Sequence, residues 1–203
     1  MQQNNELYYI DCGAHFGETV KEFLDTGVIT SEYNVICFEP NPKSFEKLSE
    51  NTDLFSKFKT VELNQKAVWE SNESKTFLME CYAPEKYDGQ GSTLIPEHSW
   101  RPNDYGVYDR SISVITVDLD SLIKTLIDNH DTTPNIVVKL DIEGSEFVVL
   151  EKMITSGTIK KISKLYIEFH AWAMRDNTQQ YQVRQEKIIT KLTEFELNWS
   201  MWK

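Results

Sequence analysis

The sequence predicts an α/β fold in which a doubly wound, mostly parallel sheet carries helices on both faces. Apolar strand-like runs alternate with helical stretches, which is the pattern of a parallel sheet covered on both sides. The first run ends in a turn bracketed by Gly13 and Gly17 and then passes into a helix. The strongest run, at residues 136–141, is apolar almost throughout, as a buried central strand should be. Together these features are typical of a Rossmann-like architecture.

The first half of the chain supplies strands and helices in alternation. Val20, Phe23 and Leu24 recur at helical spacing, so they predict a helix whose apolar side faces the core. In order, the expected elements are the strand at 8–11, the helix through 24, the strand at 34–39, the helix over 44–51 and a third strand over 60–69.

The second half repeats this alternation after a long loop. The loop is rich in Gly, Pro, Tyr and Asp and runs to about residue 110. Residues 197–202 have the composition of one more strand, but nothing remains to form its hairpin partner. In order, the other expected elements are the strands at 76–82 and 113–117, a helix from Asp120, the strand at 136–141, a helix over 145–156, the strand at 164–170 and a helix over 179–194.

Size and composition limit the classes of protein. The 203 residues suffice for one domain, 1–203, which is either minimal at its C-terminal edge or a module of a longer protein. The formal net charge of −11 argues against a nucleic-acid partner, because phosphate binding needs clustered Lys and Arg. No apolar run is long enough to span a bilayer. Cys12, Cys37 and Cys81 lack metal-ligand spacing, so we expect buried thiols and a cytoplasmic protein.

The turn after the first strand indicates a nucleoside ligand. Gly13 and Gly17 would let the backbone approach a ligand, and the following helix offers unpaired N–H groups. The spacing is neither the Gly-x-Gly-x-x-Gly of dinucleotide enzymes nor a P-loop. Asp11 beside the turn would repel phosphates, so we expect a ligand that lacks a pyrophosphate and carries positive charge.

Glu39 closes the second strand and is a candidate for binding ribose. It lies 22 positions after Gly17, near the ~20 residues at which an acid typically accepts hydrogen bonds from ribose hydroxyls. The alternative is an ordinary acid that caps the next helix.

Acidic residues also gather after the strands at 136–141 and 164–170. Asp141 and Glu143 follow the first of these strands, where unpaired carboxylates would be costly, whereas Glu146 reads as part of a helix start. His170 is either a packed residue, or a base or substrate contact. Asp141, Glu168 and His170 have ligand atoms suited to a divalent ion, but no tight ligand spacing supports one, so we expect no metal.

These motifs resemble those of FkbM-type methyltransferases over residues 8 to 170. The most specific segment is Lys-x-Asp-x-Glu-Gly-x-Glu at 139–146, and His15 departs from the family pattern, which commonly has Asn there. The other motifs that carry the resemblance are Asp-x-Gly-Ala-x-x-Gly at 11–17, Phe-Glu-Pro-Asn-Pro at 38–42, Lys-Ala-Val at 66–68, Gly-Ser-Thr-Leu at 91–94 and Val-Asp-Leu-Asp-Ser-Leu at 117–122.

The resemblance implies methylation of a hydroxyl group with S-adenosylmethionine as cofactor and S-adenosylhomocysteine as product. The acceptor would be a sugar or glycan, for instance a deoxysugar such as rhamnose, and the enzyme would be fused to or work with glycosyltransferases. Asp141 and Glu143 would face the reacting centre. The cofactor-binding residues it implies are Asp11, Gly13, Ala14, His15, Phe16, Gly17 and Thr19 for the methionine part, Glu39 and Pro40 for the ribose, Ala67 and Val68 for the adenine, and Asp141 beside the sulfonium.

Methyl transfer requires an aligned hydroxyl and a base that takes its proton. The candidates for the base are Asp141, His170 and Glu143, in that order. Lys139 is expected to pair with these acids and to contact the substrate. The aromatic and polar loop at 83–110 is expected to bind the acceptor, unless its aromatic side chains pack onto the sheet. The residues of this loop assigned to the acceptor are Trp100, Arg101 and Tyr105.

Three other functions fit parts of the pattern. An inactive nucleoside-binding module would not need Asp141 and Glu143. A nicotinamide-dependent oxidoreductase would need a different glycine spacing. An O-methyltransferase for a non-sugar small molecule would differ in the acceptor.

Overall fold

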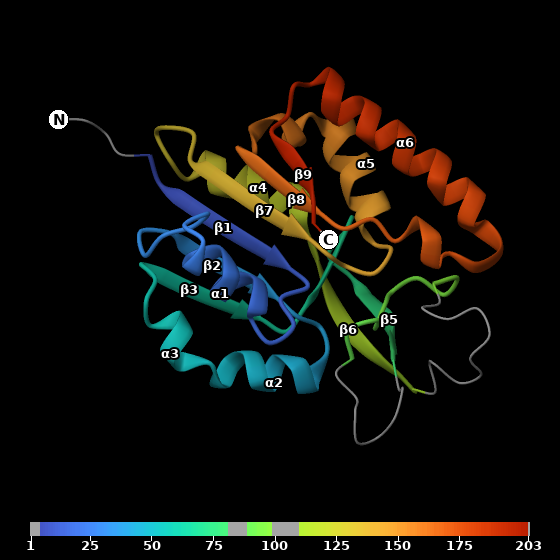
Figure 1. Cartoon of the computed structure of the whole chain (residues 1–203), viewed down its shortest axis with the longest axis horizontal. Coiled ribbons are helices and arrows are strands. Elements are labelled where there is room, and N and C mark those ends of the chain that lie inside the picture. The colour runs from blue at the N-terminus through green and yellow to red at the C-terminus, as the bar shows by residue number, and fades with distance from the viewer. Residues whose placement is uncertain (1–4, 81–88, 99–109, 203) are drawn as a thin grey trace.

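The computed structural model describes residues 5–80, 89–98 and 110–202 (Figure 1). Its centre is a parallel sheet of six strands in the order β3-β2-β1-β7-β8-β9. The chain moves outward from β1 to β3 and then returns beside β1 with β7, so the topological switch point lies between β1 and β7. This confirms the predicted fold class. The strands are β1 Leu7–Cys12, β2 Asn34–Phe38, β3 Thr60–Asn64, β7 Asn135–Leu140, β8 Lys164–Ile167 and β9 Trp199–Met201.

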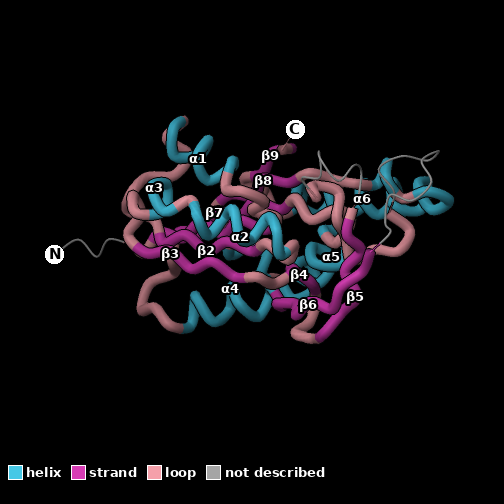
Figure 2. The backbone as a smooth tube through the Cα atoms, turned by 90° about the horizontal axis from the view of Figure 1, so that it is seen from below, coloured by secondary structure: helices cyan, strands magenta, loops and turns pink. Residues whose placement is uncertain are grey.

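Alternate residues of each central strand enter two separate cores, one on each face of the sheet. Ile10 and Val138 pack with one set of helices, whereas Tyr9 and Val137 pack with the other. Figure 2 shows α1 and α4 on opposite sides of the sheet. One face is covered by α4 Leu119–Asp128, α5 Glu146–Ser156 and α6 Thr178–Glu194, and the other by α1 Glu18–Asp25, α2 Pro42–Glu50 and α3 Thr52–Phe55.

The expected third strand over 60–69 is two strands in two sheets, which corrects the prediction. β3 is a partly exposed edge of the central sheet, whereas β4 Ala67–Trp69 is fully buried. β4 pairs with β6 Arg110–Asp118, which also pairs with β5 Ser74–Met79. The order of this second sheet is β4-β6-β5. Ala67 and Val68 are thus buried as part of the second sheet and do not extend the edge strand of the central sheet.

The strand expected near the C-terminus is present as β9, but it needs no hairpin partner. Helix α6 carries the chain back along the sheet, and β9 then pairs in parallel with β8. Cys12 and Cys37 are free and buried, as predicted, and Cys81 lies outside the described residues. Within the described ranges, no helix is both long and apolar enough to cross a membrane.

Both glycines of the first turn make room for the protein itself. Gly13 has φ 84°, and a Cβ added there would lie 1.9 Å from the backbone oxygen of Asp141. Gly17 has φ 90°, and its added Cβ would meet the side chain of Leu48 at 3.2 Å. Both glycines are therefore needed for close packing of the turn on its neighbours, and the expected approach of a ligand to the turn stays a prediction.

We predict that Gly13→Ala lowers the free energy of unfolding by about 3 kcal/mol or more, because the new Cβ must displace backbone as well as adopt a left-handed φ. Gly27→Ala is the matched control, since Gly27 has φ 76° and nothing lies within 4 Å of its added Cβ. This control should cost only about 1 kcal/mol. Urea unfolding measures both, and equal losses would contradict the close approach at Gly13.

Candidate active site

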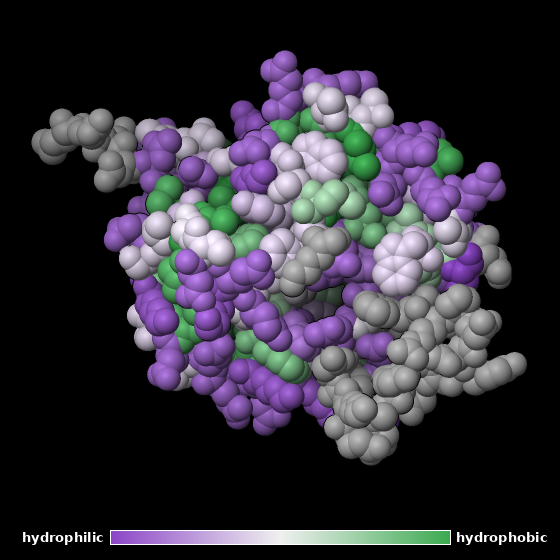
Figure 3. Space-filling view, viewed as in Figure 1, coloured by the Kyte–Doolittle hydropathy of each residue, from purple (hydrophilic) through white to green (hydrophobic). Residues whose placement is uncertain are grey.

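A cavity of about 290 Å³ opens where β1, β2, β7 and β8 end. Figure 3 shows a hollow in the middle of the face that carries these strand ends. Ala67, Val68 and Phe77 give one part of the wall an apolar surface, whereas Asp141 and Glu168 make another part acidic. The cavity therefore lies at the carboxyl ends of the strands beside the switch point, where α/β sheets bind their ligands.

Glu39 is anchored at the cavity wall by two backbone N–H groups. His15 N donates to one carboxylate oxygen and Asn41 N donates to the other, both at 2.8 Å. Burial raises the pKa of Glu39 to about 7, although these two N–H groups act to lower it. Asn41, not Glu39, caps α2, because its side chain accepts from Lys43 N. Each Glu39 oxygen keeps a lone pair for a further donor, so this carboxylate is placed to accept from a ligand.

His15 has a backbone role that explains its place in the turn. Its φ of 48° is left-handed, a conformation in which Asn, Asp and His are enriched among non-glycine residues. That conformation directs the His15 N–H toward Glu39. The imidazole Nδ1 lies 3.0 Å from Glu18 Oε1. The turn thus fixes the carboxylate of Glu39 through its main chain.

The buried ammonium of Lys139 joins three oxygen atoms from two strand ends. Its Nζ donates to the Gly13 carbonyl at 2.8 Å and lies 3.4 Å from Asp11 Oδ1 and 3.2 Å from Asp141 Oδ2. Burial lowers the pKa of Lys139, but the two carboxylates outweigh this effect and raise the pKa overall. The expected pairing of Lys139 with acids is thus present; Lys139 also lines the cavity, and its contact with a substrate stays a prediction.

Asp11 is fully buried and faces Lys139. Its other oxygen accepts from the Tyr9 hydroxyl at 3.1 Å. Asp11 and Lys139 are register partners on β1 and β7, so their side chains emerge side by side on the face covered by α1. Asp11 is not among the described residues that line the cavity. The partner of Asp11 in this structure is Lys139, and the expected contact of Asp11 with a positive ligand stays a prediction.

The loop after β7 is strained and tightly held. Glu143 has φ 50° and Gly144 has φ 96°, and the Thr93 hydroxyl donates to the Glu143 carbonyl at 2.5 Å. The fully buried Glu146 accepts from Gly144 N and from His170 N, each at 2.8 Å. Glu146 thus has the structural role that its position predicted, and it joins the loops that follow β7 and β8. Such strain persists only where surrounding contacts fix it.

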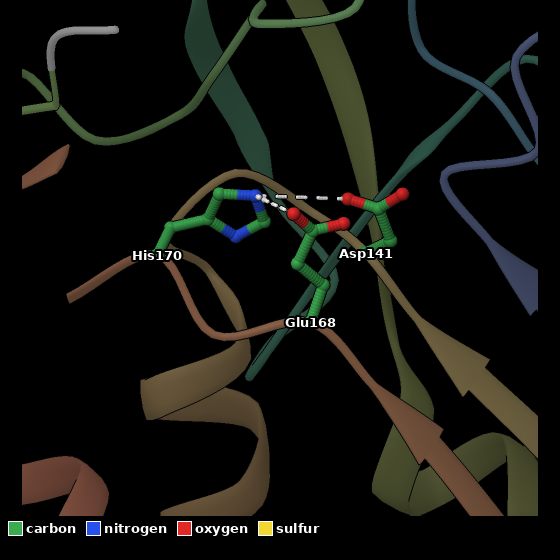
Figure 4. A group of neighbouring side chains, drawn as sticks. All are labelled: Asp141, Glu168 and His170. Atoms are coloured by element: carbon green, nitrogen blue, oxygen red, sulfur yellow. Dashed lines mark ion pairs between the residues drawn. The ribbon is translucent and has the colours of Figure 1, made fainter. Parts of the chain in front are cut away.

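His170 is buried among carboxylates (Figure 4). Its Nε2 lies 3.4 Å from Glu143 Oε2 and 3.8 Å from both Asp141 Oδ1 and Glu168 Oε1. Burial lowers the pKa of His170, but Glu146, Glu143 and the other acids raise it to about 10. An imidazolium has no lone pair to accept a proton, which argues against His170 as the base.

Two residues that the sequence prediction left out complete the acidic part of the site. Glu168 lines the cavity, and burial followed by the charge of Asp141 raises its pKa to about 7. His98 is buried with its Nε2 2.9 Å from Glu143 Oε2, and burial lowers its pKa to about 3. The sequence around His98 has no local pattern that would predict its contact with Glu143. From the sequence, Glu168 was a possible ligand of a divalent ion with Asp141 and His170, but it was not a candidate for the base.

The structure brings most of the predicted site residues together. Phe16 and Gly17 are not among the described lining residues; the Phe16 ring stacks on His15 instead. His170 lies behind Asp141 and Glu168, which line the wall. Trp100, Arg101 and Tyr105 lie outside the described residues. The predicted residues that line the cavity are Gly13, Ala14, His15, Thr19, Glu39, Pro40, Ala67, Val68, Lys139, Asp141 and Glu143.

Comparisons with known proteins agree with the fold. The model of the family described as Methyltransferase FkbM domain matches residues 11–194. No curated protein matches the chain. The crystal structure of Methyltransferase FkbM from Methylobacillus flagellatus KT is similar, with a TM-score of 0.51 at 15% sequence identity. The match covers 94% of this chain and 38% of that chain, so this chain spans well under half of that protein's length. At this identity the likeness shows a shared fold.

We predict that Lys139→Met lowers the free energy of unfolding by about 3–5 kcal/mol, because it leaves the buried Asp11 carboxylate without a cation. Asp11→Asn in the Lys139→Met background should restore part of the loss by removing that charge. Lys21→Met is the control, since Lys21 and Asp25 are 66% and 54% exposed and their pair should contribute less than about 1 kcal/mol. Urea unfolding of the four proteins measures this, and similar losses for the two lysines would contradict it.

Proposed function

The chain belongs to the FkbM methyltransferase family, and we propose that it transfers the methyl group of S-adenosylmethionine to a hydroxyl of a sugar or glycan. The main support for this proposal is the chemical character of the two cavity walls. One wall holds the anchored carboxylate of Glu39 beside an apolar surface, and the other wall is acidic. A nucleoside with a positively charged sulfonium fits both walls, because its ribose and base suit the first wall and its charge suits the second.

The two walls suggest how the cofactor would bind. Glu39 would accept hydrogen bonds from the ribose hydroxyls, as acids at this position of the fold commonly do. Ala67 and Val68 are buried and apolar, so they suit the adenine ring. The methionine part would lie along the turn at His15, and the sulfonium would then face Asp141.

The transfer would be an in-line displacement at the methyl carbon. The acceptor oxygen forms a bond to the methyl carbon as the carbon–sulfur bond breaks, and S-adenosylhomocysteine leaves with the bonding electron pair. The hydroxyl proton passes to a carboxylate at the cavity wall. Asp141 is our first candidate for this base, because Lys139 holds its Oδ2 while Oδ1 points away from the lysine, toward His170.

Glu168 is a second candidate for the base. It lines the same wall, and its pKa of about 7 suits proton transfer near neutral pH. Glu143 lies deeper and is held by His98. The charged His170 would stabilise these carboxylates instead of taking the proton. We also propose that the enzyme works with glycosyltransferases, which supply glycan acceptors.

We predict methyl transfer from labelled S-adenosylmethionine to at least one member of a panel of mono- and oligosaccharides that includes deoxysugars. Mass spectrometry of the product should locate the methyl group on an oxygen. Transfer only to non-sugar hydroxyl compounds would contradict the acceptor class. Cofactor binding without transfer to any acceptor would favour an inactive module.

We predict that Glu39→Gln weakens the binding of S-adenosylmethionine about tenfold to a hundredfold, because a charged acceptor of hydrogen bonds is lost. Isothermal calorimetry measures the affinity, and thermal unfolding checks that the variant is folded. Glu46→Gln makes the same change at an exposed position on α2 and should leave the affinity unchanged. Equal affinities for wild type and Glu39→Gln would remove the ribose assignment.

A further inference from the structure

The imidazole of His170 points an unsatisfied nitrogen at two carboxylates. The His170 side chain is 1% exposed, and its Nε2 has no hydrogen-bond partner within the part of the chain that the structure describes. Its Nδ1 lies 3.3 Å from Glu146 Oε1, which also accepts from the backbone N–H of His170. Glu146 therefore holds the ring so that Nε2 faces Asp141 and Glu168 (Figure 4).

Nε2 makes no hydrogen bond among the described residues, and its nearest carboxylate oxygen, Glu143 Oε2, lies 3.4 Å away. Asp141 Oδ1 and Glu168 Oε1 are each 3.8 Å away, beyond the ~3.2 Å at which N–H···O bonds form. Two ligands of one metal ion, each ~2.1 Å from it, lie roughly 3.0 Å to 4.2 Å apart, depending on their angle. The three ligand atoms of Asp141, Glu168 and His170 lie within 4.8 Å of one another.

The charge of the site also calls for a cation. Four carboxylates, those of Asp141, Glu143, Glu146 and Glu168, lie within 3.8 Å of the His170 ring nitrogens. The ammonium of Lys139 is shared between Asp141 and the buried Asp11. In the absence of a bound ion, a proton on Nε2 offsets part of this negative charge, and a metal ion at Nε2 would replace that proton.

We propose that Asp141 Oδ1, Glu168 Oε1 and His170 Nε2 bind a divalent transition-metal ion such as Zn²⁺ or Mn²⁺. Mixed oxygen and imidazole ligands suit these ions better than Mg²⁺ or Ca²⁺, which prefer oxygen alone. The contact from Glu146 to Nδ1 is the carboxylate–histidine pair that usually orients a metal-bound imidazole. The sequence offers no ligand spacing for this site, because the three residues meet only when β7 and β8 pair.

The site is open on the side of the cavity. Asp141 and Glu168 line the cavity, and each has a side chain that is 26% exposed. An ion held by three protein ligands keeps positions for water or for an oxygen of a bound molecule. If the proposed function holds, that oxygen is the acceptor hydroxyl, and the ion would make its proton easier to pass to the Glu168 oxygen that does not bind the ion.

The test is calorimetric titration of the untagged, chelator-treated chain with ZnCl₂ and with MnCl₂, in the absence of cofactor and acceptor. We expect one saturable site, and binding about tenfold or more weaker in Glu168→Gln and in Asp141→Asn. Glu18→Gln changes another cavity carboxylate that lies outside the group and should bind the ion like wild type. Thermal unfolding checks that each variant is folded.

A second measurement reads the histidine directly. Nitrogen NMR of the imidazoles should show His170 Nε2 changing from its protonated to its metal-bound signal when Zn²⁺ is added. No saturable binding at millimolar ion, binding that both ligand variants leave unchanged, or a His170 signal that stays protonated would each overturn the site. Neither measurement requires methyl transfer. Such a result would therefore not contradict the proposed function, which the methyl-transfer assay tests separately.

Discussion

The ammonium of Lys139 holds together the two strand ends on which the whole site depends. It reaches the carbonyl of Gly13 in the turn after β1 and the carboxylate of Asp141 after β7, while Asp11 balances its charge from inside the core. Taking these charges out of water is costly unless each finds its partner, so the arrangement fixes one geometry. The turn and the loop then form adjoining walls of one cavity.

The same ion network divides the carboxylates of the site into two groups. Asp11 and Glu146 are fully buried and hold protein groups in place. Asp141 and Glu168 reach the cavity wall, where a ligand can meet them. Glu39 belongs to a separate wall and depends on the main chain of His15, not on Lys139. Loss of Lys139 should therefore affect stability and the acidic wall more directly than the Glu39 wall.

Features that depend on local sequence patterns could be predicted from the sequence. Features that depend on the pairing of distant segments could not. Alternating apolar runs were enough for the sheet and its helices, and the position of Glu39 after a strand placed it correctly at the cavity. The register that sets Asp11 beside Lys139 arises from the pairing of β1 with β7, which are far apart in the chain. The move of Ala67 into a second sheet and the contact of His98 with Glu143 likewise have no local signal. The charge of His170 was the hardest property to predict, because acids on several segments raise its pKa.

A crystal structure with S-adenosylhomocysteine bound tests the central claim most directly, namely that Lys139 sets two strand ends to form a pocket for this cofactor. We expect ribose hydroxyls on Glu39, adenine against Ala67 and Val68, and the sulfur on the side of Asp141, with the Lys139 contacts unchanged. A ligand bound elsewhere on the molecule, or bound here only after Lys139 leaves Asp11 and Asp141, would contradict it.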